Sequence, residues 1–277
     1  EVAGLLRPRL AAAPGVAAVD ITGPGFLNIT LAADDAVRRA LSEGDHYGHG
    51  GALSGHRYRL RPAPHLRAEV TADALARLLQ AAGADTGPAP GDGDAPEIPV
   101  TPAPPPGDPA VLEARYGTDA LRWAFLRTPA GNLPRLTATL LEQREPNQLF
   151  RIRYAHSRTC ALARNAADLG IRHTQRDGPA QARAADHPAA RALRTVIGDL
   201  PTVVESAARH RAPDRLARHL VQLADAFLRF QSDCPPLPMG DEATTDAHHA
   251  RLELTAAAGT ALANGLTLLG VSAPERV

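Results

Sequence analysis

The amino-acid sequence predicts an α+β protein with a small N-terminal α/β unit, a Pro-rich linker and an all-α antiparallel helical bundle. The chain is 44% hydrophobic and only 4% aromatic, so its core consists mainly of Ala, Leu and Val, which favours packed helices. Residues 86–109 contain nine Pro and four Gly, a composition typical of an extended linker. Segments that alternate as strands precede this run, whereas the residues after it have helical spacing.

The N-terminal unit is predicted from short segments separated by turn residues. We expect a helix over residues 2–12, a strand over 16–21, a turn at Gly23-Pro24-Gly25 and a second strand over 26–31. A helix to about residue 43, a strand over 56–60 and a helix over 71–82 follow, the last one ended by Gly83.

The C-terminal region contains only helical patterns. We expect helices over residues 119–126, 136–143, 146–169, 188–197, 203–210, 214–231 and 243–269. The loops between them are short, which predicts an antiparallel bundle. The expected domain limits are therefore 1–85 for the N-terminal module, 86–115 for the linker and 116–277 for the helical domain.

Composition excludes several classes of protein. No run of 18 apolar residues is present, so we expect no membrane span, and the first ten residues do not have the pattern of a signal peptide. The two cysteines, Cys160 and Cys234, are too few for a disulfide framework or a zinc site. We expect a cytoplasmic protein with no metal and no cofactor.

Positive charge is concentrated in one part of the chain. The formal net charge is zero, and the chain has no Lys, so all 30 positive charges are Arg. Residues 118–173 contain nine Arg against four acidic residues. Because the planar guanidinium binds phosphate with two hydrogen bonds and stacks on bases, this region is a candidate for RNA contact.

Four segments of the C-terminal region carry a family resemblance. They are Asp119-Ala120-Leu121-Arg122, the helix from Asn147 to Arg158 with its Tyr154-Ala-His156 core, the helix from Leu216 that ends in Cys234-Pro235, and the last residues, 262–277. In this order and spacing they resemble the anticodon-binding helical domain of arginyl-tRNA synthetases, which is named after the Asp-Ala-Leu-Arg (DALR) motif. The resemblance implies a DALR-type bundle that binds tRNA.

The N-terminal unit resembles another part of the same synthetases. The segment Gly23-Pro-Gly-Phe-Leu-Asn28 is similar to the Gly-Pro-Gly-Phe-x-Asn strand of their N-terminal additional domain, which grips the D-loop corner of tRNA. The resemblance implies that Phe26 stacks on an unpaired D-loop base and that Asn28 forms hydrogen bonds with it. Two residues apart on one strand, the two side chains share a face.

The resemblance also implies a set of anticodon-side residues on the helix after Asn147. Arg151, Tyr154 and Arg158 have the spacing of one helical face, which could follow a phosphate backbone or stack on bases. Arg153 stands where the family usually has Gln, and His156 matches the family but is expected to be a packing residue.

Val277, in place of the usual terminal Met, completes the anticodon-side set. In the family this terminal residue lies near the anticodon pocket. The change from Met to Val therefore predicts relaxed recognition.

The parts needed for aminoacylation are not recognisable in this sequence. The family uses an His-x-Gly-His loop and a Lys-bearing loop to hold ATP. Residues 61–70 stand near the place of the first loop but lack its Gly and its second His, and the chain has no Lys. The sequence therefore predicts no catalytic residues for arginine activation and no synthetase activity.

Three functions remain open at this point. The first is a non-catalytic tRNA-binding protein derived from an arginyl-tRNA synthetase, with arginine tRNA as its partner. The second is a transferase that uses charged arginyl-tRNA to form an amide bond in a peptide natural product, with His56, His65 or Glu69 near the acceptor end. The third is a regulatory subunit that binds a full synthetase.

Overall fold

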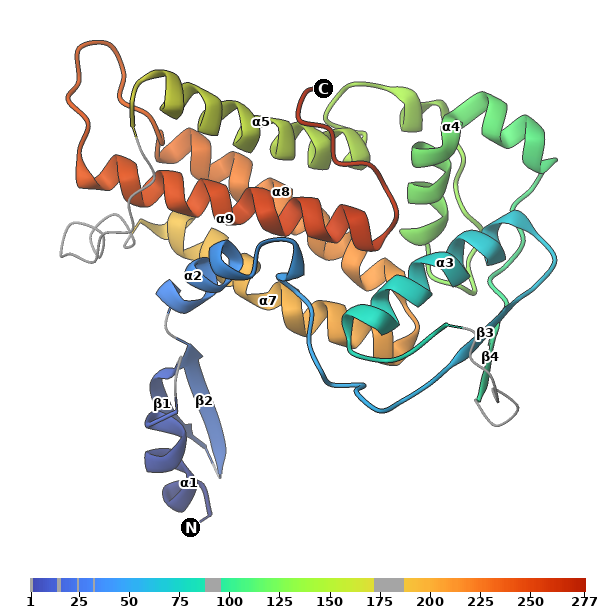
Figure 1. Ribbon diagram of the computed structural model, residues 1–277, viewed down its shortest axis with the longest axis horizontal. Helices are drawn as coiled ribbons and strands as arrows, with labels where there is room; N and C mark the ends of the chain where they lie inside the picture. Colours follow the sequence, from blue (N-terminus) through green and yellow to red (C-terminus); the bar gives the residue numbers. More distant parts are fainter. Residues whose placement is uncertain (1, 14–15, 24, 32, 88–95, 172–186) are drawn as a thin grey trace.

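Figure 1 presents a computed structural model of the chain, which describes residues 2–13, 16–23, 25–31, 33–87, 96–171 and 187–277. Its first half contains the elements α1 (Val2–Ala11), β1 (Val16–Thr22), β2 (Phe26–Leu31), α2 (Ala33–Glu43), β3 (Arg59–Pro62), α3 (Leu66–Ala81), β4 (Glu97–Val100) and α4 (Pro109–Leu126). Its second half contains α5 (Gln148–Asp168), α7 (Pro188–His210), α8 (Pro213–Asp233) and α9 (Asp246–Leu268). Two 3-10 turns, Gly44–His46 and Ala138–Leu141, complete the set. The structure confirms the predicted α+β class.

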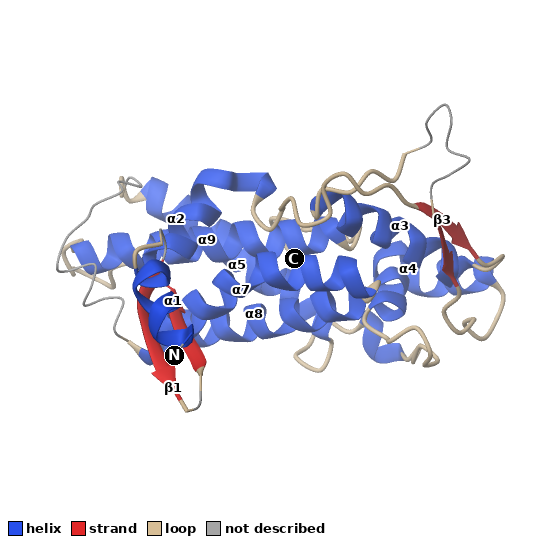
Figure 2. Ribbon diagram, turned by 90° about the horizontal axis from the view of Figure 1, so that it is seen from below, coloured by secondary structure: helices blue, strands red, loops and turns tan. Residues whose placement is uncertain are grey.

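Helices α5, α7, α8 and α9 form the bundle at the centre of the molecule, with α2 and α3 packed against α7 and α9 (Figure 1). Seen from below, the bundle is elongated, with the N-terminal hairpin near one end and β3 at the other (Figure 2). None of the helices in the described ranges is long and apolar enough to cross a membrane.

Among the described residues, two separate pairs of strands form sheets, and Arg57 and Asp85 form an isolated bridge. Strands β1 and β2 form an antiparallel hairpin in which Asp20 pairs with Asn28 and Thr22 with Phe26. Helix α1 packs on this hairpin, and Val19 on the covered face is buried. Strands β3 and β4 pair in parallel on either side of α3 in the sequence, so that β3, α3 and β4 form a single crossover unit.

The described part of the Pro-rich segment after residue 95 departs from the extended linker that we expected, and residues 88–95 lie outside the described ranges. Residues 97–100 form strand β4, and their alternation places Ile98 and Val100 in the core while Glu97 and Pro99 stay exposed. Pairing with β3 supplies the backbone hydrogen bonds that a Pro-rich segment cannot make within itself. Helix α4 then begins at Pro109, where the side chain of Asp108 accepts a hydrogen bond from the amide of Ala110 (2.9 Å).

Side chains before and after this segment contribute to one hydrophobic core. Val37 and Leu78 belong to the same cluster of buried residues as Trp123, Leu193 and Leu262. A second, smaller cluster consists of Ala166, Ile171 and Leu252. The limits 1–85, 86–115 and 116–277 stay a prediction.

The helices differ from the sequence expectation at four places. Helix α4 begins at Pro109, ten residues before the predicted start and within the expected linker, and Gly117 interrupts it. Helix α3 starts at Leu66, five residues before the predicted start, because the His65 side chain accepts a hydrogen bond from the amide of Ala68 (3.2 Å). The two helices expected over 188–197 and 203–210 are one helix, α7, with Pro201 inside it. The buried Leu200 and Val204 keep the apolar face continuous across this Pro. The helix expected over 136–143 is a single 3-10 turn.

Candidate nucleic-acid interface

The hairpin presents Phe26 and Asn28 on its open face. The Phe26 side chain is 71% exposed, and Asn28 is exposed as well. The residues paired with them, Thr22 and Asp20, lie on the same face and are also exposed. Because α1 covers the opposite face, an aromatic ring and an amide point outward side by side, an arrangement suited to an unpaired base.

Two of the predicted arginines on α5 contact α8. Arg151 forms an ion pair with Asp225, and the Nε atom of Arg158 donates to the side-chain oxygen of Gln231 (3.4 Å). The helical spacing therefore did place Arg151 and Arg158 on one side of α5. These contacts hold the two guanidinium groups at the α5–α8 edge.

Tyr154 lies between these arginines along α5 and remains accessible. Its side chain is 42% exposed, and its ring stacks on that of Phe150, with centroids 5.9 Å apart and planes inclined by 21°. Phe150 was not among the predicted site residues, although its spacing of four residues from Tyr154 could have indicated it. The stacked pair forms an aromatic platform on the outside of α5.

His156 is a buried packing residue. Only 7% of it is exposed, and its Nδ1 atom is 3.0 Å from the carbonyl oxygen of Pro274. The Sγ atom of Cys160 lies 3.8 Å from its Nε2 atom. Burial is the main reason that the pKa of the Cys160 thiol is raised above its usual value, so the thiol stays protonated at neutral pH.

Arg153 belongs to a polar cluster with Asp119 and Ser272. Its guanidinium pairs with the Asp119 carboxylate and donates to the Ser272 hydroxyl (2.6 Å) and carbonyl (3.2 Å). Asp119 also accepts from the Ser272 hydroxyl (2.6 Å) and amide (3.3 Å). Burial alone would raise the pKa of Asp119, but the hydrogen bonds from Ser272 and the charge of Arg153 outweigh it, and the pKa is lowered.

This cluster starts a series of contacts that fixes the C-terminal tail, residues 269–277, along α5. After Ser272, the carbonyl of Pro274 meets His156, and the Ser157 hydroxyl donates to the Glu275 carbonyl (3.0 Å). The tail then ends with Val277 at the mouth of a pocket between α4, α5 and the turn at 138–141.

This terminal pocket, of about 440 Å³, brings Arg153 and Val277 together. Its lining combines aliphatic, aromatic and polar side chains, namely Tyr116, Thr118, Asp119, Leu140, Leu141, Glu142, Gln143, Asn147, Leu149, Phe150, Arg153 and Val277. Two carboxylates in the lining disfavour a phosphate group. A flat ring with hydrogen-bonding edges, such as a nucleobase, matches the mixture of aromatic faces, carboxylates and amides.

Local backbone features shape this pocket. Gly117 has φ 72° and ψ 163°, a conformation that strains other residues, and it breaks α4 so that Tyr116 and Asp119 both reach the pocket. On the facing side, Asn147 caps α5 by accepting from the amide of Leu149 (3.1 Å) and donates to the carbonyl of Leu140 (3.0 Å).

The Asp-Ala-Leu-Arg motif joins separate parts of the fold. Asp119 holds the tail through Ser272, and Ala120 and Leu121 are buried. At its other end, Arg122 pairs with Asp73 of α3, and burial lowers the pKa of its guanidinium. The charged side chains at both ends of the motif, Asp119 and Arg122, thus form contacts within the protein.

The histidines considered for the transferase are explained by local structure. The Nδ1 atom of His65 accepts the capping hydrogen bond of α3, and the ring of exposed His56 stacks on Tyr58 with centroids 6.1 Å apart. Glu69 is an exposed residue in the first turn of α3. In the described part of the chain, no three His, Cys, Asp or Glu side chains are close enough together to hold a metal ion.

Comparison with known proteins agrees with this reading of the C-terminal region. Residues 152–277 match the family model of the DALR anticodon binding domain. The chain is 42% identical over 164 residues to the arginine–tRNA ligase of Pseudarthrobacter chlorophenolicus, a match that covers 58% of this chain and 29% of the ligase. It is also 42% identical over 163 residues to the Clavibacter sepedonicus ligase, covering 58% of this chain and 28% of that protein. The chain thus spans less than a third of the length of these relatives.

The fold is similar to a solved synthetase structure. The arginyl-tRNA synthetase of Thermus thermophilus superposes with a TM-score of 0.50 at 18% sequence identity, covering 79% of this chain and 40% of that one. The C-terminal part of this chain is thus similar to the DALR anticodon-binding domain and to arginyl-tRNA synthetases.

Proposed function

We propose that this chain binds tRNA, with arginine tRNA as its preferred partner, and does not activate arginine. The observation that carries the proposal is the terminal pocket, where the pinned tail brings Val277 next to Arg153 within a region homologous to an anticodon-binding domain. Aromatic faces, carboxylates and amides in its lining suit the edge and face of an unpaired anticodon base.

The open face of the hairpin supplies a second proposed contact. Phe26 is 71% exposed beside Asn28, and burial of such a ring is favourable when it meets a base. Base–aromatic stacking contributes about 1–3 kcal/mol per base. We assign Phe26 and Asn28 to the D-loop corner and the α5 residues Arg151, Arg153, Tyr154, His156 and Arg158 to the anticodon side, together with Val277.

The α5 residues have different roles in this proposal. Tyr154 on its aromatic platform contacts RNA directly, and Arg151 and Arg158 at the α5–α8 edge supply positive charge near the backbone. Arg153 and His156 act on the protein side, since both hold the tail.

We infer the absence of synthetase activity from the residues that would have to hold ATP. The sequence has no Lys for the second ATP-binding loop. Near the place of the first loop it has His65, whose side chain caps α3. We therefore assign this protein to tRNA binding and propose that it is cytoplasmic.

The test is a binding measurement with charged arginine tRNA, uncharged arginine tRNA and a non-cognate tRNA, over a series of salt concentrations. Phe26→Ala combined with Asn28→Ala is expected to weaken binding about tenfold or more. Ile29→Ala is the matched control, because Ile29 is exposed on the same strand but alternates to the other face. Equal binding of all three tRNAs, or no binding, would contradict the proposal.

The same measurement also bears on the other two functions. A marked preference for the charged form would favour the transferase that uses arginyl-tRNA. Absence of any RNA binding, together with binding to a full arginyl-tRNA synthetase in a separate measurement, would favour the regulatory subunit.

A further inference from the structure

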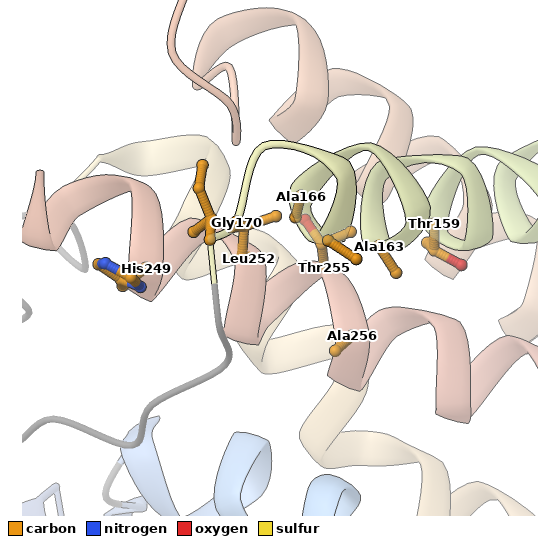
Figure 3. A pocket seen from close by; sticks show the side chains of 10 residues that line it. Thr159, Ala163, Ala166, Gly170, His249, Leu252, Thr255 and Ala256 are labelled. Atoms are coloured by element: carbon orange, nitrogen blue, oxygen red, sulfur yellow. The ribbon is translucent and has the colours of Figure 1, made fainter. Parts of the chain in front are cut away.

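Three hollows on the described surface differ in their chemistry. The first, of about 460 Å³ between α5 and α9, is lined by four Ala and by Leu252, together with the polar residues Thr159, His249 and Thr255 (Figure 3). The terminal pocket has two carboxylates in its lining. The third hollow, of about 410 Å³ between α7 and α8, is lined by Thr202, Val203, Ser206, Arg215, Arg218, His219 and Gln222.

The lining of this α7–α8 hollow consists mostly of hydrogen-bond donors. Thr202 and Ser206 are one turn apart on α7, and Arg215, Arg218 and Gln222 share one face of α8. No carboxylate is among the residues described as lining it. Two guanidinium groups with hydroxyl and amide donors form a set that matches the oxygens of an anion.

The two guanidinium groups are held in place by the protein. Arg215 donates to the Ser206 hydroxyl (2.7 Å), a neutral partner, so its charge is not compensated by that contact. Arg218 pairs with Asp214 (2.7 Å), whose side chain is only 10% exposed, whereas that of Arg218 is 70% exposed. The acid therefore lies beneath the guanidinium, and the positive group faces solvent.

His219 gives an independent indication that a ligand reaches this hollow. It is 96% buried, since its exposed fraction is 4%, and its Nε2 atom has no hydrogen-bond partner among the described residues. A buried polar atom without a partner costs free energy. A polar ligand that enters the hollow beside this ring could recover part of that cost.

Helix α8 links the hollow to the arginines of α5. Asp225 follows Arg218 by seven residues, or about 10 Å along the same side of α8. Asp225 pairs with Arg151 of α5, next to the Tyr154 platform. One strand of RNA in contact with Tyr154 could therefore reach the hollow.

We propose that the α7–α8 hollow binds a phosphate group of the RNA backbone, through the guanidinium groups of Arg215 and Arg218 and the hydroxyl of Ser206. This inference rests on the proposed tRNA binding and adds to it a phosphate site outside the terminal pocket. A phosphate contact carries no base information, so the hollow fixes the position of the RNA and does not select its sequence.

The test compares Arg215→Gln/Arg218→Gln with Arg229→Gln. Arg229 is on the same helix, its side chain is 80% exposed and it pairs with Asp233 four residues away, so it matches Arg218 outside the hollow. The double variant is expected to bind arginine tRNA roughly tenfold more weakly and to lower the salt slope of binding by about 1. Both tRNAs, cognate and non-cognate, should be affected by a similar factor.

A second arm uses pyrophosphate and needs no RNA. Pyrophosphate at millimolar concentration is expected to raise the melting temperature of the wild type and of Arg229→Gln, but not that of the double variant. Far-UV circular dichroism of each protein establishes that the variants are folded.

The outcomes separate the two sources of phosphate. Loss of both responses in the double variant supports an RNA phosphate, whereas loss of the pyrophosphate response with unchanged tRNA affinity overturns the RNA assignment and leaves a site for a free phosphate compound. If the double variant matches the wild type in both arms, there is no phosphate site. If no tRNA binds even to the wild type, the proposed function fails, and the pyrophosphate arm still decides whether the hollow binds phosphate.

Discussion

Asp119 is the residue on which the geometry of the C-terminal tail depends most. Its carboxylate accepts hydrogen bonds from the amide and hydroxyl of Ser272 and pairs with Arg153. Asp119→Asn is expected to destabilise the protein by about 1–2 kcal/mol and to weaken tRNA binding, because Val277 is no longer fixed at the pocket. Urea unfolding and a tRNA titration measure the two effects.

The matched variant for this prediction is Asp225→Asn. Asp225 also pairs with an α5 arginine, but its side chain is 51% exposed, so the loss should be below about 1 kcal/mol. Because the pKa of Asp119 is lowered in the folded protein, its contribution is present above the pKa of the unfolded chain and disappears as the pH falls through the folded value. Equal effects of the two variants would show that the tail does not depend on Asp119.

His219 predicts a loss of stability in mild acid. Burial is the main cause that lowers its pKa to about 4, against an ordinary value of 6.5. Between these pH values the unfolded chain binds more protons, so stability falls as the pH is lowered from 6.5 towards 4, by about 3 kcal/mol at most. A hydrogen bond with the backbone of Val196 acts in the opposite direction, but burial outweighs it.

Urea unfolding at pH 7, 6, 5 and 4 measures this effect. His219→Leu should remove most of the pH dependence in that range. His49→Leu should remove less, because burial also lowers the pKa of His49 but its side chain is exposed in the folded protein. An unchanged pH profile in His219→Leu would assign the acid sensitivity to other groups.

The sequence indicates candidate RNA-binding residues, but it does not indicate the contacts that their side chains form within the protein. The spacing of Arg151, Tyr154 and Arg158 predicted their common side of α5. The partners of the two arginines, Asp225 and Gln231, are more than 70 residues away, so nothing local in the sequence indicates them. Their assignment to the anticodon side, like that of Phe26 and Asn28, stays a prediction.

At the level of elements, α8 and α9 depend on a close approach at Gly265. A Cβ atom there would lie 2.4 Å from the Cδ2 atom of Leu220, which is fully buried. Gly265→Ala is therefore expected to destabilise the protein by about 1–3 kcal/mol, despite the better helix propensity of Ala. Gly4→Ala in α1 is the control, because nothing lies within 4 Å of its added Cβ atom.

Thermal unfolding of both variants measures the contrast. Gly4→Ala should be neutral or slightly stabilising, since it relieves the propensity cost of a helical Gly. A Gly265→Ala protein as stable as the wild type would mean that Leu220 can move aside without cost.

Elements were predicted where a local pattern determines them. The hairpin, α5, α8 and α9 are bounded by turn residues or by helix start and stop signals, and they end close to the expected residues. Strand β4 was missed because Ile98 and Val100 form too short a pattern within a Pro-rich run, and its partner β3 is distant in the sequence. The start of α3 was missed because His is not among the usual capping residues.

For the whole molecule, the composition predicted a domain boundary, but residues on both sides of that boundary pack together. A Pro-rich run predicts an extended segment, but whether its ends pack together depends on contacts between distant residues. Helix α2 lies on α7 and α9, and the side chain of Asn264 on α9 donates to the carbonyls of Gly44 (2.8 Å) and Tyr47 (3.0 Å). These contacts tie residues before the Pro-rich segment to the last helix of the bundle.

Arg67 makes the strongest of these connections, and it carries the last prediction. It is 1% exposed, and its guanidinium donates to four carbonyl oxygens, those of Ala103, Thr128, Pro129 and Asn132, at 2.7–3.1 Å. Burial without a carboxylate among these partners lowers its pKa. Arg67→Met leaves these carbonyls without their donor in a buried place, which should cost about 3–5 kcal/mol.

Arg59→Met provides the comparison, because Arg59 forms an exposed ion pair with Glu97 that contributes less than about 1 kcal/mol. Trp123, the only Trp of the chain, is fully buried in α4 and reports on the region next to the loop that Arg67 holds. In the wild type, urea transitions followed by Trp123 fluorescence and by far-UV circular dichroism should coincide, because both sides of the Pro-rich segment share one core. Arg67→Met should move both transitions to lower urea, whereas two separate transitions in the wild type would show that the segment divides the chain into independent folding units.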